Sequence, residues 1–324
     1  MKLRAPFLLA ALWLLSLAGG VLAALTRLDG FAALCGLASF AFILALIASL
    51  SRAAPYAADL PELDFALLPG ASFRLALVLL LAGILLVFVL GMMAGPGTSV
   101  MLACALLGLA LAVSWRRRLA WPVAAAGLAV GLIAALGIML LGEADPAWAV
   151  FNLLTLPPAF MGGALLVQRA RLAQVRTLQG QVLLALKGFL WGCALALPAA
   201  LLNLLGNIYQ GDTWVVHAWQ PLYAIVPAVA EETWARVFII ALCYALLRPK
   251  AKTHPRRAVL IAVLTSALVH GFAHTGIDPF GLVIGSLLYG LPAALLFLKV
   301  DFEHAVGYHF FVDFVRFFAA YLLV

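Results

Sequence analysis

The sequence predicts an all-α protein that crosses a membrane many times, and three observations lead to this fold class. The chain has 324 residues, of which 66% are hydrophobic and only 10% are charged, whereas soluble domains are nearer half apolar and a quarter charged. Apolar runs of about 20 residues, the length that a spanning helix needs, recur along the whole chain. The basic residues gather in alternate loops between these runs. No water-soluble fold has enough interior for this much apolar surface, so lipid must surround most of it.

Apolar runs and the turn residues that separate them predict about eleven transmembrane helices. In chain order, the predicted spans are 6–26, 31–51, 73–94, 97–115, 119–141, 147–168, 180–203, 217–247, 257–275, 279–299 and 303–323. The connecting segments are short and leave no room for a separate soluble domain.

The distribution of Lys and Arg predicts one orientation for all eleven spans. With the N-terminus inside the cell, sixteen of the 20 basic residues fall on the inner side, and only Arg27 falls outside. The positive-inside rule therefore places the N-terminus inside and the C-terminus outside. Residues 1–23 also resemble a cleavable signal, but their apolar run is long for a signal core, so we expect a retained helix. Cleavage would leave every later span unchanged in orientation.

Composition also excludes several classes of protein. The net charge is +7, but the basic residues form no single stripe, so no nucleic-acid partner is expected. All four cysteines lie in apolar runs and are predicted to be small buried hydrophobes. They are Cys35, Cys104, Cys193 and Cys243. The 15 Arg against 5 Lys indicate a GC-rich bacterial genome, which predicts the plasma (inner) membrane as the location.

Polar residues inside the apolar spans divide the chain into two parts. Charge at membrane depth is unfavourable and usually functional, and the first seven spans contain almost none. We therefore predict that 1–203 is a scaffold and that 204–324 is the functional core. In that core, eight titratable groups lie in or beside three apolar spans: Glu231, Glu232, Arg236, His270, His274, His309, Asp313 and Arg316.

The first group of these residues lies in the segment Glu231 to Arg236. Glu232 and Arg236 are four residues apart, so on a helix they share a face and can form an ion pair. Glu231 lies about 100° around the helix from Glu232 and is less well placed to share the same arginine. An unpaired carboxylate at low dielectric suits a general base for water. The alternative is a structural charge cluster that holds helices together.

Two histidine motifs follow on later spans. His270 and His274 are four residues apart, which is the spacing of helical zinc sites, although two histidines alone are also common as hydrogen-bonded structure. His309 and Asp313 share one helix face in the same way. The alternative for that pair is an aspartate that only orients a buried histidine.

In this order and on three helices, the motifs resemble those of the CAAX prenyl endopeptidase family. This family belongs to the CAAX protease and bacteriocin-processing superfamily of intramembrane proteases, and the resemblance covers roughly 217–324. It implies an all-helical membrane fold and hydrolysis of a peptide bond. It also implies a catalytic set of Glu231, which activates water, with Glu232, Arg236, His274, His309 and Asp313.

Two residues depart from the family pattern. Asp313 stands where many members have Asn, and an ionised aspartate cannot donate to an oxyanion. Either Asp313 stays protonated, or it orients His309 and another group such as Arg236 is the donor. His270 stands where the family usually has Phe. A zinc ion held by Glu231, His270, His274 and His309 therefore stays open, but we expect no cofactor, because the family pattern lacks His270.

The expected partners are the lipid bilayer and a membrane-embedded or lipidated peptide, including CAAX-type substrates. Two other functions remain open. The first is a non-catalytic adaptor or bacteriocin-immunity protein of the same family. The second is a proton- or ion-coupled transporter, although the polar residues of the last third have no counterpart in the first half, as inverted repeats would give.

Helix geometry leaves one conflict within this prediction. Straight helices place Glu231 near mid-membrane, His309 in the inner third and His274 near the outer end. These three residues could converge only if the span 257–275 tilts or stops short. We therefore expect the loop 274–279 to dip into the membrane beside a wet cavity.

Overall fold

The computed structural model describes residues 72–206, 208–248, 255–276 and 278–324, with positions 12, 16 and 38 nearer the N-terminus. The predicted spans 6–26 and 31–51 lie outside the described ranges. Within the described part, the protein is all-helical and has no strand. The predicted fold class is thus confirmed for this part of the chain, while the count of eleven spans and the orientation stay predictions.

The helices of the described part follow the nine remaining predicted spans closely. The N-terminal group comprises α3 (Phe73–Ala94), α4 (Pro96–Ser114), α5 (Trp121–Leu140), α6 (Pro146–Ala170), α7 (Val182–Leu195) and α8 (Leu197–Leu205). The C-terminal group comprises η5 (Gln220–Ala224), α9 (Ile225–Glu232), η6 (Thr233–Ile240), α10 (Ala241–Leu247), α11 (Pro255–Thr275), α12 (Pro279–Ile284), η8 (Gly285–Gly290), α13 (Leu291–Lys299) and α14 (Phe302–Leu323). Short 3₁₀ turns lie at Arg116–Arg118, Thr177–Gln179 and Ile208–Gly211.

Seven of these helical segments are long and apolar enough to cross a membrane. They are Pro96–Ser114, Trp121–Leu140, Pro146–Ala170, Val182–Leu205, Arg256–Thr275, Gly281–Lys299 and Phe302–Leu323. The predicted spans 73–94 and 217–247 are helical over Phe73–Ala94 and from Gln220 to Leu247, but neither is one of the seven. The chain is therefore a multi-pass membrane protein.

Local sequence signals explain where several helices begin. Asp145 precedes α6, and its carboxylate accepts hydrogen bonds from the backbone N–H groups of Ala147 and Trp148 at 2.9 and 3.0 Å. Asp278 caps α12 in the same way through the N–H of Gly281. In both helices a proline follows the capping residue, where its missing N–H does no harm.

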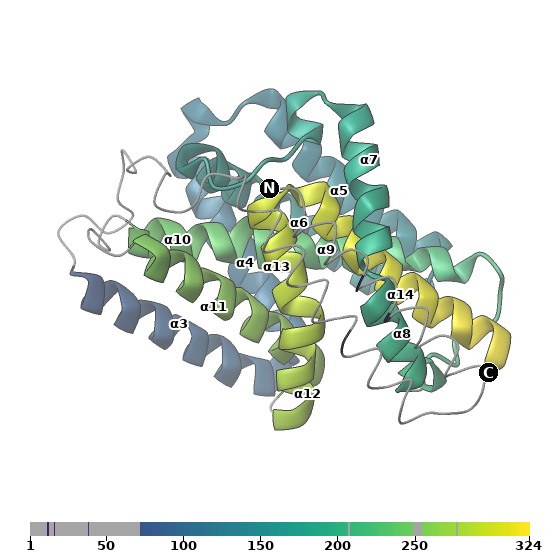
Figure 1. Ribbon diagram of the computed structural model, residues 1–324. Helices are drawn as coiled ribbons and strands as arrows, with labels where there is room; N and C mark the ends of the chain where they lie inside the picture. Colours follow the sequence, from purple (N-terminus) through teal and green to yellow (C-terminus); the bar gives the residue numbers. More distant parts are fainter. Residues whose placement is uncertain are drawn as a thin grey trace.

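The C-terminal helices pack against the N-terminal group at very short range. In Figure 1, α3, α10 and α11 run side by side, and α14 crosses behind α7 and α8. Gly307 of α14 lies against the backbone carbonyl of Phe189 in α7, and Gly192 of α7 lies against that of His304. A Cβ atom at either glycine would collide with backbone. Small residues that let helices approach closely are typical of helix packing in membranes.

A cluster of charged and polar residues, which we call the α14 tether, fixes the start of α14. It comprises Arg176, Thr177, Asp301, Glu303 and His304. Glu303 accepts hydrogen bonds from the backbone N–H groups of Arg176 and Thr177 at 3.2 and 2.9 Å and from the Thr177 hydroxyl at 3.0 Å. Asp301 contacts the Arg176 guanidinium at 2.5 Å and caps α14 through the His304 N–H at 2.9 Å. The tether thus joins the loop after α6 to the helix that carries His309.

Hydrogen bonding sets the charge state of Asp301, which lies between α13 and α14. Burial alone would raise the pKa of its carboxyl group. Hydrogen bonds from His304 and Arg176 outweigh burial and lower this pKa below its usual range. Asp301 therefore stabilises the fold as a carboxylate.

Candidate active site

Glu231 and Glu232 lie at the end of α9, where the helix changes from α to π winding. The segment from Gln220 to Leu247 is continuous, but it begins as a 3₁₀ turn and becomes a π-helix, η6, directly after Glu232. Such π segments often mark functional sites. The expected ion pair is present: Arg236 Nε lies 3.0 Å from Glu232 Oε2, and both side chains are completely buried.

Arg236 has a second polar partner besides Glu232. Its Nη1 donates to the hydroxyl of Ser266 at 2.9 Å, and that hydroxyl donates to the carbonyl of Ala235 at 2.8 Å. Sequence reasoning missed Ser266. It lies on the same face of α11 as His270 and His274, four and eight residues earlier, so helical spacing could have found it.

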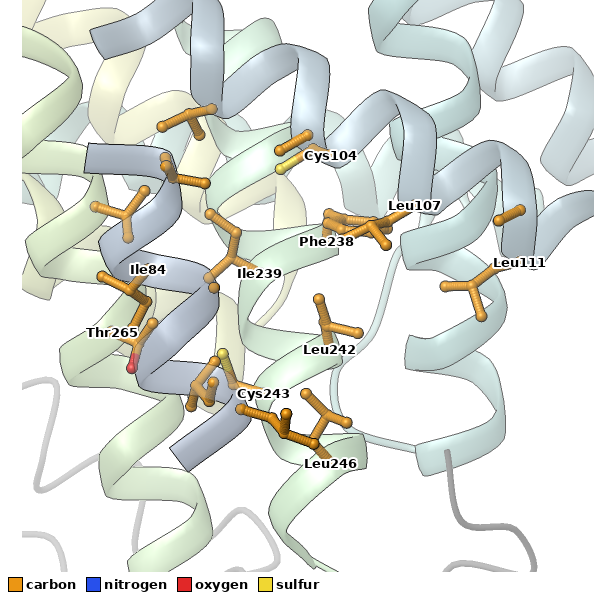
Figure 2. A pocket seen from close by; sticks show the side chains of 18 of the residues that line it. Ile84, Cys104, Leu107, Leu111, Phe238, Ile239, Leu242, Cys243, Leu246 and Thr265 are labelled. Carbon is orange, nitrogen blue, oxygen red and sulfur yellow. The ribbon is translucent and has the colours of Figure 1, made fainter. Parts of the chain in front are cut away.

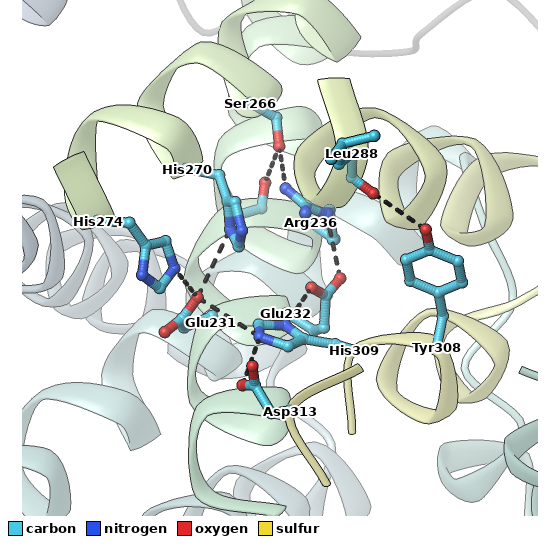
Figure 3. Close-up of polar contacts among 11 residues, drawn as sticks. Glu231, Glu232, Arg236, Ser266, His270, His274, Leu288, Tyr308, His309 and Asp313 are labelled. Atoms are coloured by element: carbon cyan, nitrogen blue, oxygen red, sulfur yellow. Dashed lines mark hydrogen bonds and ion pairs between the residues drawn. The ribbon is translucent and has the colours of Figure 1, made fainter. Parts of the chain in front are cut away.

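Glu231 lies at the meeting point of three histidines (Figure 3). Its Oε2 atom is hydrogen-bonded to His274 Nε2 at 2.7 Å. The same oxygen lies 3.6 Å from His270 Nδ1 and 3.7 Å from His309 Nε2. Arg236 thus pairs with Glu232, while α11 delivers His274 directly to Glu231. A Glu–His pair of this kind can accept a proton from water and pass it on.

His309 connects the two glutamates and Asp313. Its Nδ1 atom lies 3.0 Å from Glu232 Oε1, while its Nε2 atom lies 3.4 Å from Asp313 Oδ2. An imidazole donates from both nitrogens only in its charged form. Carboxylates on both sides therefore favour a positively charged His309, oriented by Asp313 and Glu232.

A cavity of about 240 Å³ opens beside Glu231 and His274, which both line it together with Asn152 and Trp234. The side chain of Glu231 is 16% exposed and that of His274 is 44% exposed. Neither Arg236 nor His309 lines it, but His309 Nε2 lies 3.7 Å from Glu231 Oε2, whereas Arg236 is completely buried against Glu232. The cavity can therefore bring water to the Glu231–His274 pair, and Arg236 is badly placed as an oxyanion donor.

A second cavity of about 440 Å³, which we call the apolar cavity, lies between α3, α4, α10 and α11 (Figure 2). Apolar side chains from these helices line most of it. Phe238 and Val269 also line it, one helical turn from Trp234 and Ala273 of the first cavity. The two cavities thus adjoin along η6 and α11.

Arg316 does not join the site, although the sequence grouped it with the other intramembrane charges. Its guanidinium forms a bidentate pair with Asp212, with distances of 2.5 and 2.6 Å. Asp212 lies in the segment between α8 and η5. This pair ties the C-terminal part of α14 to that segment and is structural.

The three helices converge without any break in α11, which is continuous to Thr275 and ends at Gly276 with a positive φ of 60°. His274 lies near the end of α11 and His309 only two turns into α14, yet both contact Glu231. Their helices therefore cannot be parallel with aligned ends, as the straight-helix estimate assumed. The insertion of the loop 274–279 into the membrane stays a prediction.

Comparison with known proteins identifies the region that contains these residues. Residues 213–315 match the family model described as Type II CAAX prenyl endopeptidase Rce1-like. Neither the curated proteins nor the solved structures contain a match to the chain. The matched region begins four residues before the resemblance seen in the sequence and holds all six predicted catalytic residues. This match supports, for residues 213–315, the resemblance to the CAAX protease superfamily that the sequence motifs indicate.

Proposed function

We propose that this protein is an intramembrane endopeptidase in which Glu231 and His274 activate water. The observation that carries the proposal is the 2.7 Å hydrogen bond between these residues at the wall of a cavity. The match of residues 213–315 to a protease family supports hydrolysis as the reaction class. The activity, the catalytic roles and the substrate are our proposals.

The chemistry follows from the positions of the side chains. A water molecule in the cavity loses a proton to the Glu231–His274 pair, and its oxygen attacks the carbonyl carbon of the peptide. The charged His309 ring lies close enough to stabilise the negative oxygen of the tetrahedral intermediate. The C–N bond then breaks, and the proton held by the pair passes to the leaving nitrogen. Glu232 and Asp313 orient His309, and Arg236 holds Glu232.

We further propose that the substrate is a membrane-embedded or lipidated peptide, of which a CAAX-type peptide is one example. The apolar cavity supports this class, because it can receive a hydrocarbon chain while the peptide reaches Glu231 in the neighbouring cavity. A bulky residue in the apolar cavity offers a test. Ala103→Phe should raise KM for a lipidated peptide several-fold and leave KM for its unlipidated form unchanged.

The proposed setting is the plasma membrane, with the N-terminus inside and the C-terminus outside. Cysteine labelling of intact and permeabilised cells tests this arrangement. Cysteines placed at 116–118 and 248–257 should label from one side, and those at 204–216 from the other. Labelling of 116–118 and 204–216 from the same side would overturn the eleven-span arrangement.

The function is tested by membrane proteomics of cells that carry either the wild-type protein or the Glu231→Ala variant. We expect uncleaved precursors to accumulate with the variant and to disappear when the wild-type protein is restored. Equal precursor levels in both cell types, with both proteins folded and equally abundant, would favour the adaptor function.

A further inference from the structure

His270 has no task in the proposed reaction, although it is one of the most deeply buried polar residues of the site. Its side chain is 1% exposed, and its Nδ1 atom has no hydrogen-bond partner. A buried polar atom without a partner is unfavourable by about 1–3 kcal/mol. This nitrogen lies 3.6 Å from Glu231 Oε2, too far for a good hydrogen bond. The gap between the two atoms therefore suits a third species that binds both.

The ligand atoms around this gap are those of a transition-metal site. One nitrogen each from His270 and His274 and one oxygen from Glu231 lie within 4.8 Å of one another. Ligands bound to Zn²⁺ at 2.0–2.2 Å in a tetrahedron are about 3.4 Å apart. The distances from Glu231 Oε2 to His274 Nε2 and His270 Nδ1, 2.7 and 3.6 Å, lie on either side of that spacing. His274 is 44% exposed, so an ion has a path into the site.

The charge of the cluster also favours a divalent cation. Glu231, Glu232 and Asp313 contribute three carboxylates, while Arg236 contributes one positive charge. With the charged His309 included, the group still has one net negative charge. A cation bound beside Glu231 compensates this charge.

We infer that Glu231, His270 and His274 form a binding site for a divalent transition-metal ion of the Zn²⁺ type, and that the ion inhibits the enzyme. An ion held there occupies the Glu231 oxygen and the His274 nitrogen, which replaces the hydrogen bond between them. The pair then has no free atom to accept a proton from water. The inhibition rests on the proposed function, whereas the binding of the ion does not.

Metal binding is measured on the full-length protein in detergent, by equilibrium dialysis against ZnCl₂ followed by elemental analysis. The wild type should bind about one equivalent. His270→Phe should bind at least about tenfold more weakly, because loss of even an outer partner of a metal ligand weakens binding 10–100-fold. His217→Phe is the matched control, since His217 is exposed and stacks on Trp219 away from the site. It should bind like the wild type.

Two further measurements keep this inference testable if His270→Phe misfolds. Co²⁺ added to the wild type should give the visible bands of a tetrahedral site, and Glu231→Gln should abolish them. Added Zn²⁺ should reduce substrate turnover by the wild type and not by folded His270→Phe. Absence of Zn²⁺ binding to the wild type, or equal binding by folded His270→Phe, would overturn the inferred metal site. Binding together with undiminished turnover would overturn the inhibition, and binding to a protein without protease activity would refute only the proposed function.

Discussion

The two clusters of buried charge on α14 have the same kinds of residues but differ in how completely their atoms are paired. The α14 tether lies at the start of the helix, and the candidate active site begins at His309, two turns later. Each combines two or more carboxylates with an arginine and at least one histidine. In the tether, both Glu303 oxygens and both Asp301 oxygens have hydrogen-bond partners.

The candidate active site leaves some atoms unpaired. Arg236 Nη2 and His270 Nδ1 are buried without a hydrogen-bond partner, and Glu231 borders a cavity. Native proteins satisfy nearly all buried polar groups, so exceptions call for a functional reason. A fully paired cluster thus holds helices together, whereas an incompletely paired one beside a cavity has atoms free to bind water, substrate or an ion.

The largest effect on stability is expected for Glu232→Gln. This change leaves Arg236 completely buried without a charged partner, and loss of one member of a buried ion pair typically destabilises by about 3–5 kcal/mol. Unfolding in detergent measures the loss. Unchanged stability would mean that the Glu232–Arg236 ion pair does not stabilise the fold. The pairing of buried atoms would then not explain how the two clusters differ.

The next effect is on activity and concerns His274→Asn. Loss of half of the Glu231–His274 pair should reduce turnover by at least about 100-fold, the lower range for general acid–base catalysis. Thermal stability should change little, because His274 is the most exposed member of the cluster. Full activity in this variant would remove His274 from the mechanism.

In the tether, Glu303→Gln should have the opposite pattern. The amide keeps one oxygen acceptor but turns an NH₂ group toward backbone donors, which should cost about 1–3 kcal/mol of stability. Turnover per folded molecule should match the wild type. A loss of turnover in the folded variant would show that the tether also shapes the active site.

The smallest expected effect is the dependence of stability on acid. The pKa of Asp301 is lowered in the folded protein, so its contribution is present above the ordinary aspartate value of about 3.9. It is lost as the pH falls from there through the lower folded value. Melting temperatures measured from pH 6 to pH 3 should fall less steeply in Asp301→Asn. Equal slopes would contradict a tether held by the Asp301 carboxylate.

Much of the fold could be predicted because the relevant signals are local. Pairs such as Gly95–Pro96 and Asp145–Pro146 mark helix boundaries in the sequence, and the spacing of Glu232 and Arg236 predicts their ion pair. The tether could not be predicted, because Arg176 and Asp301 are 125 residues apart. The π-helical winding of η6 and η8 also has no clear sequence signal, since short segments show no distinct period.

The candidate site was predicted as a set of residues but not as an arrangement. Glu231, His274 and His309 followed from their motifs, whereas straight-helix geometry wrongly kept them apart. The relative inclination of α11 and α14 depends on packing between helices distant in the sequence. Close contacts such as Gly307 against Phe189 and Gly271 against Ser286 set it, and spacing along one helix contains no information about them.

The most direct test of the account compares Glu231→Gln with the wild type in turnover of a prenylated CAAX-type peptide, or of a precursor found by proteomics. Both proteins are reconstituted into vesicles and first compared by thermal melting. Glu231→Gln keeps the side-chain shape and removes the proposed general base. The account predicts near-normal thermal stability with turnover reduced at least about 100-fold. A Glu231→Gln protein that cleaves as fast as the wild type would contradict it.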